Sequence, residues 1–539
     1  MNFRRVVLMF SILFTGQLSG QDSWKWTGFW KGDISAMGTK IGIILEVTEK
    51  KSAVSTDTKN GDSKSKTALF KSTLDVPMQG ARGITVSKTD IHQSHIEWEI
   101  ESIGARCVGT RKDSVTIEAQ WSQGGKTLPL TLRWSPEKYL LRYQTPKPPY
   151  AYNTRSASFS HPSGKLIFGG TLTIPNDSLY RIALAANPKL AATFPIPSKA
   201  TVIRREKRGD EIREITDGIV KYPAVLLISG SGSQDREESI ADHKPFAVWA
   251  DYLTRNGMAV LRVDDRGVGA SKGQPEFIAT TTTESLVEDA AAALRWLKQQ
   301  PDIDTNFIFI VGHSEGANIA IKVAAKEPNL RGVVSLAGMT QPGIETTIYQ
   351  LRPLWQKNTN DAETLEQLSA ITRRMAQASQ YHRNPAAAKK FVKDTLLKVE
   401  SSKYKKAIQY LKKYDLPASG KKDIEALLST QIGESYQIPW IQYYLHFDPR
   451  PEYKSCQPAL LLVQGGKDLQ INPKATKALV QEMTQQGQYV SLLEFGNLNH
   501  LFQHTQTGEI SEYFTLDETL ALEVQAGVMR WFSIQLQGR

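Results

Sequence analysis

The run from Phe307 to Ala320, FIFIVGHSEGANIA, constrains the fold of this chain more than any other segment. Its first residues are apolar, aromatic or β-branched, which predicts a buried strand. The strand pattern ends at Gly312, and the residues after Gly316 favour a helix. A Gly-x-Ser-x-Gly sequence between a strand and a helix is typical of a nucleophile elbow, a strained turn that presents a serine, here Ser314. A residue larger than glycine at 312 or 316 would crowd the strand and the helix.

A second Gly-x-Ser-x-Gly sequence extends from Gly269 to Gly273. It also follows a strand-like run, residues 259–263, but a Gln-Pro dipeptide comes next where an elbow needs a helix. The sequence around Ser271 therefore predicts a glycine-rich turn. The strand–turn–helix context favours Ser314 as the nucleophile.

Strands and helices alternate on both sides of the elbow. Before and around it, buried strands are predicted at 222–228, 259–263, 307–311 and 331–338, with helices at 246–255 and 283–299. After residue 458 the pattern predicts a strand, a helix at 475–486, a strand at 489–494 and a closing helix at 516–536. This alternation indicates an α/β fold with a doubly wound, mostly parallel sheet.

The alternation is interrupted between residues 341 and 454. Polar, helical sequence fills this stretch, which predicts a helical insertion that caps the active-site end of the sheet. A basic insertion at 176–221 precedes the first buried strand.

The N-terminal third of the chain has a different pattern. Residues 22–145 contain tryptophan-rich runs with period-2 alternation, separated by polar turns, which predicts an antiparallel β-sandwich or small barrel. A polar tract at 50–66 is predicted to be an exposed hairpin loop. A Pro- and Tyr-rich linker at 143–152 separates this domain from the α/β domain, which is predicted to span residues 157–539.

The first 20 residues have the pattern of a secretory signal peptide. Arg4 and Arg5 precede an apolar run at 6–14, and small polar residues follow. This segment predicts a secreted, periplasmic protein, with an uncleaved N-terminal anchor as the alternative. The apolar run is too short to cross a bilayer. No later run is long and apolar enough for stable membrane insertion.

Composition narrows the class of protein further. The 539 residues are 40% hydrophobic and 22% charged, as in soluble globular proteins. The net charge of +11 comes largely from lysine and arginine runs without interleaved aromatic residues, so nucleic acid is not a predicted partner. Cys107 and Cys456 lie in different predicted domains and are interpreted as unpaired thiols, with a disulfide as the alternative.

A nucleophilic serine needs a base, and the base needs an orienting acid. Beyond residue 468 the histidines are His500 and His504, and His500 directly follows the strand predicted to end at Glu494. Asp468 follows the strand at 460–464 and reaches the same sheet edge. Ser314, Asp468 and His500 are therefore the predicted catalytic residues. The alternatives are His504 as base, and Asp448 or Glu494 as acid.

The oxyanion hole needs two preorganised N–H donors. The predicted donors are the backbone N–H of Glu315 and that of Ser231, with Gly232 as the alternative; the last two lie in the small-residue loop 229–236. No Gly-Lys-Ser/Thr follows this loop, which disfavours a phosphate-binding role. Asp264 and Asp265 could form a metal or acid–base pair, but we interpret them as braces for neighbouring loops. No metal site and no cofactor are predicted.

Several short motifs carry a resemblance to a known family. They are GHSEG at 312–316, DDRGVGAS at 264–271, GKD at 466–468 and NHLFQ at 499–503. With loop 229–236 and HKPF at 243–246, they resemble the α/β-hydrolase superfamily, and within it secreted bacterial two-domain esterases related to serine-aminopeptidase-like hydrolases. The resemblance implies ester hydrolysis through an acyl-enzyme. Two departures are the Ser-Gly-Ser-Gly sequence of loop 229–236, where many relatives have His-Gly, and the length of the 176–221 insertion.

The predicted function is that of a serine carboxylesterase acting on a small-molecule ester or acylated substrate. A serine peptidase or aminopeptidase on the same triad is the first alternative, and acidic insertion residues could then recognise an amine: Glu363, Glu366 and Glu434. A non-catalytic envelope-binding protein that uses its tryptophan-rich β domain is the second. The sequence does not indicate an oligomeric state.

Overall fold

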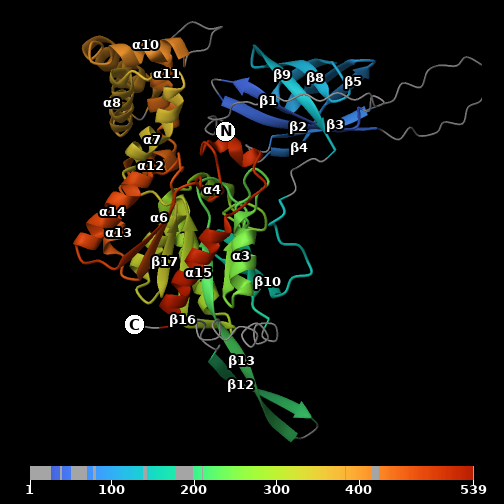
Figure 1. Ribbon diagram of the computed structural model, residues 1–539, viewed down its shortest axis with the longest axis vertical. Coiled ribbons are helices and arrows are strands. Elements are labelled where there is room, and N and C mark those ends of the chain that lie inside the picture. Colours follow the sequence, from blue (N-terminus) through green and yellow to red (C-terminus); the bar gives the residue numbers. More distant parts are fainter. Residues whose placement is uncertain are drawn as a thin grey trace, which may run out of the picture.

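A computed structural model describes residues 26–36, 39–49, 70–76, 81–136, 142–176, 198–208, 211–382, 384–414 and 424–537. These residues form an all-β domain, an α/β domain and a group of helices inserted into the α/β domain (Figure 1). The predicted signal peptide and the tract at 50–66 lie outside the described residues.

The N-terminal all-β domain is an antiparallel meander with the strand order β4-β3-β2-β1-β9-β8-β7-β6-β5. The two strands at the ends of this order, β4 and β5, are consecutive in the chain and separated by Val86 and Ser87. Val86 N–H donates to Ser72 O, and Ser87 N–H donates to Glu99 O, so both neighbours stay attached to one bent strand. The sheet therefore closes into a barrel, and the sandwich alternative is wrong. The strands are β1 Gly28–Ala36, β2 Thr39–Glu49, β3 Phe70–Val76, β4 Ala81–Thr85, β5 Lys88–His92, β6 His95–Ile100, β7 Ala105–Arg111, β8 Thr116–Gln123 and β9 Lys126–Ser135.

Side chains that alternate along the strands fill the barrel. Trp30, Trp98 and Cys107 are fully buried in its core, as the period-2 pattern requires of inward positions. Cys107 and Cys456 are both free thiols, so the unpaired interpretation is confirmed.

The α/β domain is built on a twisted sheet with the order β10-β11-β14-β13-β16-β17-β18-β19. Strands β14 to β19 on this path are parallel, whereas β10 and β11 are antiparallel to their neighbours. The predicted mostly parallel sheet is therefore confirmed. The strands are β10 Asn153–Ser160, β11 Leu166–Ile174, β13 Glu211–Ile228, β14 Ala259–Val263, β16 Ile303–His313, β17 Gly332–Leu336, β18 Ala459–Gly465 and β19 Val490–Phe495.

Helices cover the sheet on both faces. One face carries α3 (Pro245–Arg255) and α15 (Leu522–Leu536), which contact each other; the other carries α5 (Thr283–Lys298), α6 (Glu315–Lys326) and α14 (Pro473–Gln485) (Figure 1). The closing helix begins at Leu522, so its predicted start at 516 is wrong. The N–H groups of Thr519 and Leu520 donate to Gln144 Oε1, which keeps this segment out of the helix.

Seven α-helices lie between β17 and β18 among the described residues: α7 Gly343–Gln356, α8 Ala362–Ser379, α9 Pro385–Phe391, α10 Lys405–Tyr414, α11 Ile424–Thr430, α12 Pro439–His446 and α13 Arg450–Ser455. Helices α7 to α11 share a hydrophobic core of their own, which includes Trp355 and Leu368. Side-chain caps start two of these helices, since Asp361 accepts from Thr364 N–H and Asn384 from Ala387 N–H.

The basic insertion contains a long two-stranded ribbon. Strand β12 (Ser198–Arg208) pairs with the first half of β13, which was predicted to begin only at Tyr222. The ribbon extends from the amino end of β13, away from the sheet edge at which β16 delivers Ser314 (Figure 1). None of the described helices is long and apolar enough to cross a membrane.

The linker is attached to the α/β domain by buried polar contacts. The Arg142 guanidinium donates to Ala241 O at 2.8 Å and also to Leu516 O. Gln144 donates to Leu520 O at 2.7 Å. These contacts anchor residues 142–144 beside the segment that leads into α15.

Candidate active site

The nucleophile elbow forms where β16 meets α6. Ser314 is the N-cap of α6 and has φ +53° and ψ −121°, a backbone conformation that residues other than glycine rarely adopt. A Cβ added at Gly312 would overlap the Gly316 carbonyl, and one at Gly316 would overlap the Ile228 carbonyl. The close approach of the strand ends and the helix therefore requires glycine at both positions, as predicted.

His500 and Asp468 meet on two loops at the carboxyl edge of the sheet. His500 Nδ1 lies 2.9 Å from Asp468 Oδ2, and both side chains are buried. Asp468 follows β18 and His500 follows β19, and these two strands are neighbours at the end of the sheet. The structure thus brings together the predicted acid and base, and it places Ser314 at the end of a strand of the same sheet.

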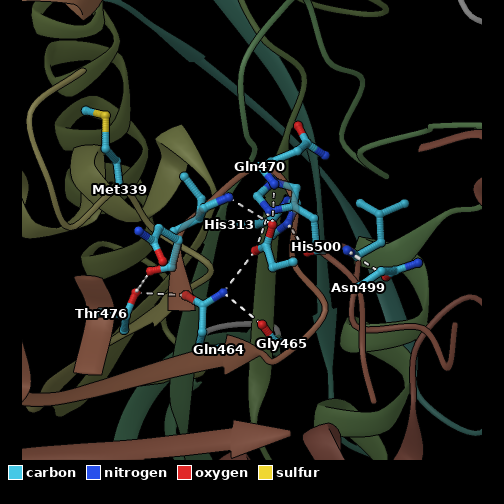
Figure 2. A network of polar contacts seen from close by, with 12 residues as sticks. His313, Met339, Gln464, Gly465, Gln470, Thr476, Asn499 and His500 are labelled. Carbon is cyan, nitrogen blue, oxygen red and sulfur yellow. Dashed lines mark hydrogen bonds and ion pairs between the residues drawn. The ribbon is translucent and has the colours of Figure 1, made fainter. Parts of the chain in front are cut away.

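Four donors hold the Asp468 carboxylate. Oδ1 accepts from the N–H groups of Gln470 (2.7 Å) and Ile471 (2.9 Å), and Oδ2 accepts from His500 and from Gln464 Nε2 (3.0 Å). Gln464 is itself oriented by Thr476, which donates to its Oε1 (Figure 2). Because these four donors occupy both oxygens, they fix the orientation of the carboxylate toward His500.

Two aspartates brace the loop 229–236. Asp265 accepts from Ser229 Oγ and Gln234 N–H, and Asp264 binds the Arg236 guanidinium and its N–H. Burial raises the pKa of Asp265 to about 8, against the effect of its hydrogen bonds. Burial also acts to raise the pKa of Asp264, but Arg236 and Ala270 N–H outweigh it, so this pKa is lowered. The interpretation of both residues as braces fits these contacts.

The Glu315 side chain connects the two segments that carry the predicted oxyanion donors. This carboxylate is buried and accepts from Thr283 Oγ1, from Trp440 Nε1 at 2.8 Å, and from the Ser231 side chain. Burial raises its pKa, although these donors oppose the shift. Gly232 has φ +97°, so the turn after Ser231 requires glycine. Glu315 therefore joins α6, the loop 229–236 and helix α12 at one point.

His313, the residue before the nucleophile, also makes buried contacts. Its Nδ1 lies 2.9 Å from Glu238 Oε1, and its Nε2 lies 3.0 Å from the carbonyl oxygen of His500 (Figure 2). Burial acts to lower the pKa of His313, but the neighbouring Glu238 carboxylate outweighs it and raises the pKa. Glu238 Oε1 also accepts Gly230 N–H at 2.6 Å, so this amide is not available to an oxyanion.

Comparison with known proteins finds a family model that matches part of the chain. Residues 242–415, about a third of the chain, match the family model described as serine aminopeptidase, S33. Together with the strand order and the strained serine, this match decides the class of domain. The chain carries an α/β-hydrolase domain.

The individual proteins that resemble this chain have low sequence identity to it. Esterase EstD of Thermotoga maritima is 27% identical over 293 residues, which cover 53% of this chain and 56% of that protein. An uncharacterised protein of Mycobacterium tuberculosis is 30% identical over 146 residues, covering 25% of this chain and 46% of that protein. The chain thus spans about half the length of the curated relatives it matches. A solved esterase of Pyrococcus furiosus has a TM-score of 0.38 at 13% identity, covering 72% of this chain and 92% of that one.

The residues considered as alternatives for the triad make other contacts. Ser271 is fully buried, and its Oγ donates to Asp264 O and accepts from Gly169 N–H. His504 is exposed and pairs with Glu518 and Glu523. The other two acids bind side chains of their own surroundings: Asp448 pairs with Arg450, and Glu494 lies 4.0 Å from Lys477.

Sequence reasoning missed four residues that contact the candidate machinery: Glu238, His313, Trp440 and Gln464. His313 and Gln464 interrupt or end apolar strands with a polar residue, a signal that could have selected them. Glu238 and Trp440 reach the site from distant loops and helices, and their sequences carry no comparable signal.

A small cavity of about 70 Å³ lies beside the loop that follows Asp468. Gln350 and Pro353 of α7 line it together with Gln470, Glu509 and Ile510. The cavity adjoins the turn after Asp468 rather than Ser314. The described residues contain no group of three or more His, Cys, Asp or Glu side chains placed to hold a metal ion.

Proposed function

We propose that this protein is a serine hydrolase that cleaves carboxylic esters through an acyl-enzyme intermediate. The observation that carries the proposal is a serine held at φ +53° at a strand end, with a buried His500–Asp468 pair on loops of the same sheet edge. A strained turn of this kind exposes the hydroxyl for attack, which a structural serine does not need. The similarity to a protein named esterase EstD supports ester bonds as the target.

In the proposed acylation step, Ser314 Oγ attacks the acyl carbonyl carbon while its proton passes to His500. Asp468 binds Nδ1, so Nε2 is the nitrogen that accepts this proton. The N–H groups of Glu315 and Ser231, with Gly232 as the alternative, stabilise the oxyanion of the tetrahedral intermediate. His500 then returns the proton to the leaving alcohol oxygen as its bond to the acyl carbon breaks.

In the proposed deacylation step, His500 removes a proton from water, and the oxygen of that water attacks the acyl carbon. The second tetrahedral intermediate uses the same oxyanion donors. It collapses when the bond to Ser314 Oγ breaks and His500 gives Oγ the proton. The products are a carboxylic acid and the free enzyme, and neither step uses a metal or a cofactor.

We further propose that the helical insertion caps this site and selects the substrate. Two of its helices reach the machinery: Tyr349 of α7 donates to Asp468 O at 2.8 Å, and Trp440 of α12 donates to Glu315. A substrate bound between them would lie against aromatic side chains of α12, including Tyr443 and Tyr444. Such surroundings suit an apolar acyl or alcohol group.

The alternative is an aminopeptidase, which the description of the matching family model favours. Recognition of a substrate ammonium group needs an unpaired acid near the nucleophile. Glu363 is paired with Lys406, and Glu366 with Arg373, so two of the acidic residues suggested by the sequence already have partners. A panel of acyl esters and aminoacyl amides of matched size would decide. An esterase should cleave the acyl esters and leave the aminoacyl amides intact, whereas an aminopeptidase should cleave the aminoacyl amides.

Labelling with a fluorophosphonate probe tests the proposal directly. We expect one covalent adduct, located at Ser314 by mass spectrometry, and no adduct in Ser314→Ala. An unlabelled, folded wild-type protein that hydrolyses no ester would reject the proposal and favour a non-catalytic envelope-binding protein.

We also propose secretion to the periplasm, which the pattern of the first 20 residues supports and fractionation of cells would test.

A further inference from the structure

A buried carboxylate–imidazole pair lies under the elbow, and the triad does not include it. Glu238 and His313 are 4% and 7% exposed, and their side chains meet at 2.9 Å. His313 is the last residue of β16 and precedes Ser314, whereas Glu238 follows the loop 229–236. Burying two ionisable groups is costly unless each is fully hydrogen-bonded, so the contacts of this pair indicate what it does.

Each member of the pair holds one part of the machinery. His313 Nε2–H donates to the His500 carbonyl oxygen at 3.0 Å, which ties the base loop to the nucleophile strand (Figure 2). Glu238 Oε1 accepts Gly230 N–H at 2.6 Å, which ties down the residue before Ser231. The pair thus contacts three segments: the loop that carries His500, strand β16 before Ser314, and the loop 229–236 that carries the predicted oxyanion donor Ser231.

The backbone of Glu238 is itself strained. Its φ of +51° lies in the left-handed region, although the residue is not glycine. Such conformations persist where the surroundings over-determine them, and they concentrate at functional sites. Here the buried contacts to His313 and Gly230 are what hold the carboxylate in place.

We propose that Glu238 and His313 are positioning residues that set the relative placement of His500, Ser314 and the oxyanion loop; this inference rests on the proposed function. His313 acts through the His500 carbonyl, and Glu238 acts through His313 and Gly230. Neither needs to touch the substrate. Losing them should lower kcat more than it raises KM, because the substrate surface is unchanged while the reacting groups are misplaced.

The hydrogen-bond donors and acceptors around Glu238 and His313 support an ion pair between them. His313 donates through Nε2–H to a carbonyl, and its Nδ1 faces a carboxylate oxygen that already accepts an N–H from Gly230. A protonated imidazole and an ionised carboxylate satisfy all of these contacts. The other titratable groups that act on this pair are His500, whose ring centre is 4.9 Å from that of His313, Asp468 on the His313 side, and Asp265 on the Glu238 side.

Two substitutions separate the contacts of His313. The amide nitrogen of glutamine can take the place of Nε2, and that of asparagine the place of Nδ1. His313→Gln therefore keeps the donor to the His500 carbonyl, and His313→Asn keeps only the contact with Glu238. We expect kcat per labelled active site to fall about a hundredfold in H313N and less than about tenfold in H313Q, with KM within about threefold of wild type in both.

The control and the second variant make the test decisive. His504→Asn replaces an exposed histidine outside the machinery and should leave kcat unchanged. Glu238→Gln keeps an acceptor for Gly230 N–H but removes the charge, and its kcat should fall about tenfold; it decides the question if H313N does not fold. Equal kcat values in H313N and H313Q, or an unchanged kcat in E238Q, would overturn the inference. A wild-type protein that binds no fluorophosphonate and cleaves no ester would instead overturn the proposed function.

Discussion

Two Gly-x-Ser-x-Gly segments of this chain have opposite environments. Ser314 occupies a left-handed turn at the start of α6, at the sheet edge where His500 and Asp468 meet. Ser271 is fully buried, and a backbone carbonyl and a backbone N–H use its hydroxyl. A hydroxyl that already serves as donor and acceptor within the core is not available for attack on a substrate.

The glycines of the two segments also serve different purposes. Gly312 and Gly316 allow the backbones of β16, β13 and α6 to approach each other. Gly269 has φ +51° and lies against the Asp264 carboxylate, whose Oδ2 accepts from Ala270 N–H. The pentapeptide therefore specifies only a tight turn of the backbone. Whether its serine can react depends on the segment that follows and on the residues in the neighbouring loops.

Ser314→Ala is the strongest test of this comparison. Removing the nucleophile should lower kcat by about 10⁶-fold with little change in stability, because the triad acts as a unit. Steady-state hydrolysis of a chromogenic ester, with thermal unfolding alongside, measures both quantities.

The matched variant is Ser271→Ala. It leaves the buried Gly169 N–H without its acceptor, which should cost about 1–3 kcal/mol of stability. Its kcat per folded molecule should match wild type. Full activity in S314A, together with lost activity in folded S271A, would reverse the assignment.

Asp468→Asn should have the next largest effect. An amide at this position cannot hold His500 in the tautomer that leaves Nε2 free to accept a proton, so kcat should fall about 10⁴-fold. Glu494→Gln provides the control, since its exposed carboxylate lies beside Lys477 and outside the candidate triad. An Asp468→Asn enzyme within about tenfold of wild type would remove Asp468 from the triad.

Gly316→Ala tests the backbone part of the comparison. The new methyl group would overlap the Ile228 and Ser229 carbonyls, and backbone atoms cannot move aside easily, so unfolding free energy should fall by about 3 kcal/mol. Gly273→Ala would meet mainly the end of the Leu166 side chain and should cost about 1 kcal/mol or less. Chemical denaturation of both variants gives the difference. Equal costs would show that close packing does not distinguish the two segments.

The last prediction concerns pH. Burial raises the pKa of Asp265 to about 8, far above that of the unfolded chain at about 4, so the folded state binds the proton more tightly. Its contribution to stability is complete below about pH 4 and is lost as pH rises through about 8. The difference in unfolding free energy between wild type and Asp265→Asn should therefore change between about pH 4 and pH 8, whereas a flat difference over this range would contradict the raised pKa.

Much of the α/β domain could be predicted because its signals are local. Strand β14 has the predicted ends, since its apolar run by itself specifies one strand. The sequence does not predict the start of β13 because charged residues interrupt the apolar ones before Tyr222. Pairing with β12 extends the strand back to Glu211. The closing helix was predicted too long because Gln144, far away in the chain, binds the N–H groups that would have begun it.

The sequence by itself determined the elbow, the order of the candidate triad and the two-domain organisation. Each of these depends on residues adjacent in the chain or on the chain order of strand ends. Only the tertiary structure decided that the β domain closes into a barrel, and that Glu238 and Trp440 bind His313 and Glu315, the two chain neighbours of Ser314. These contacts join segments tens to more than a hundred residues apart through single hydrogen bonds, and no local periodicity records such pairings. The glycines at 312 and 316 predict a turn, and the loops packed against that turn make it a candidate active site.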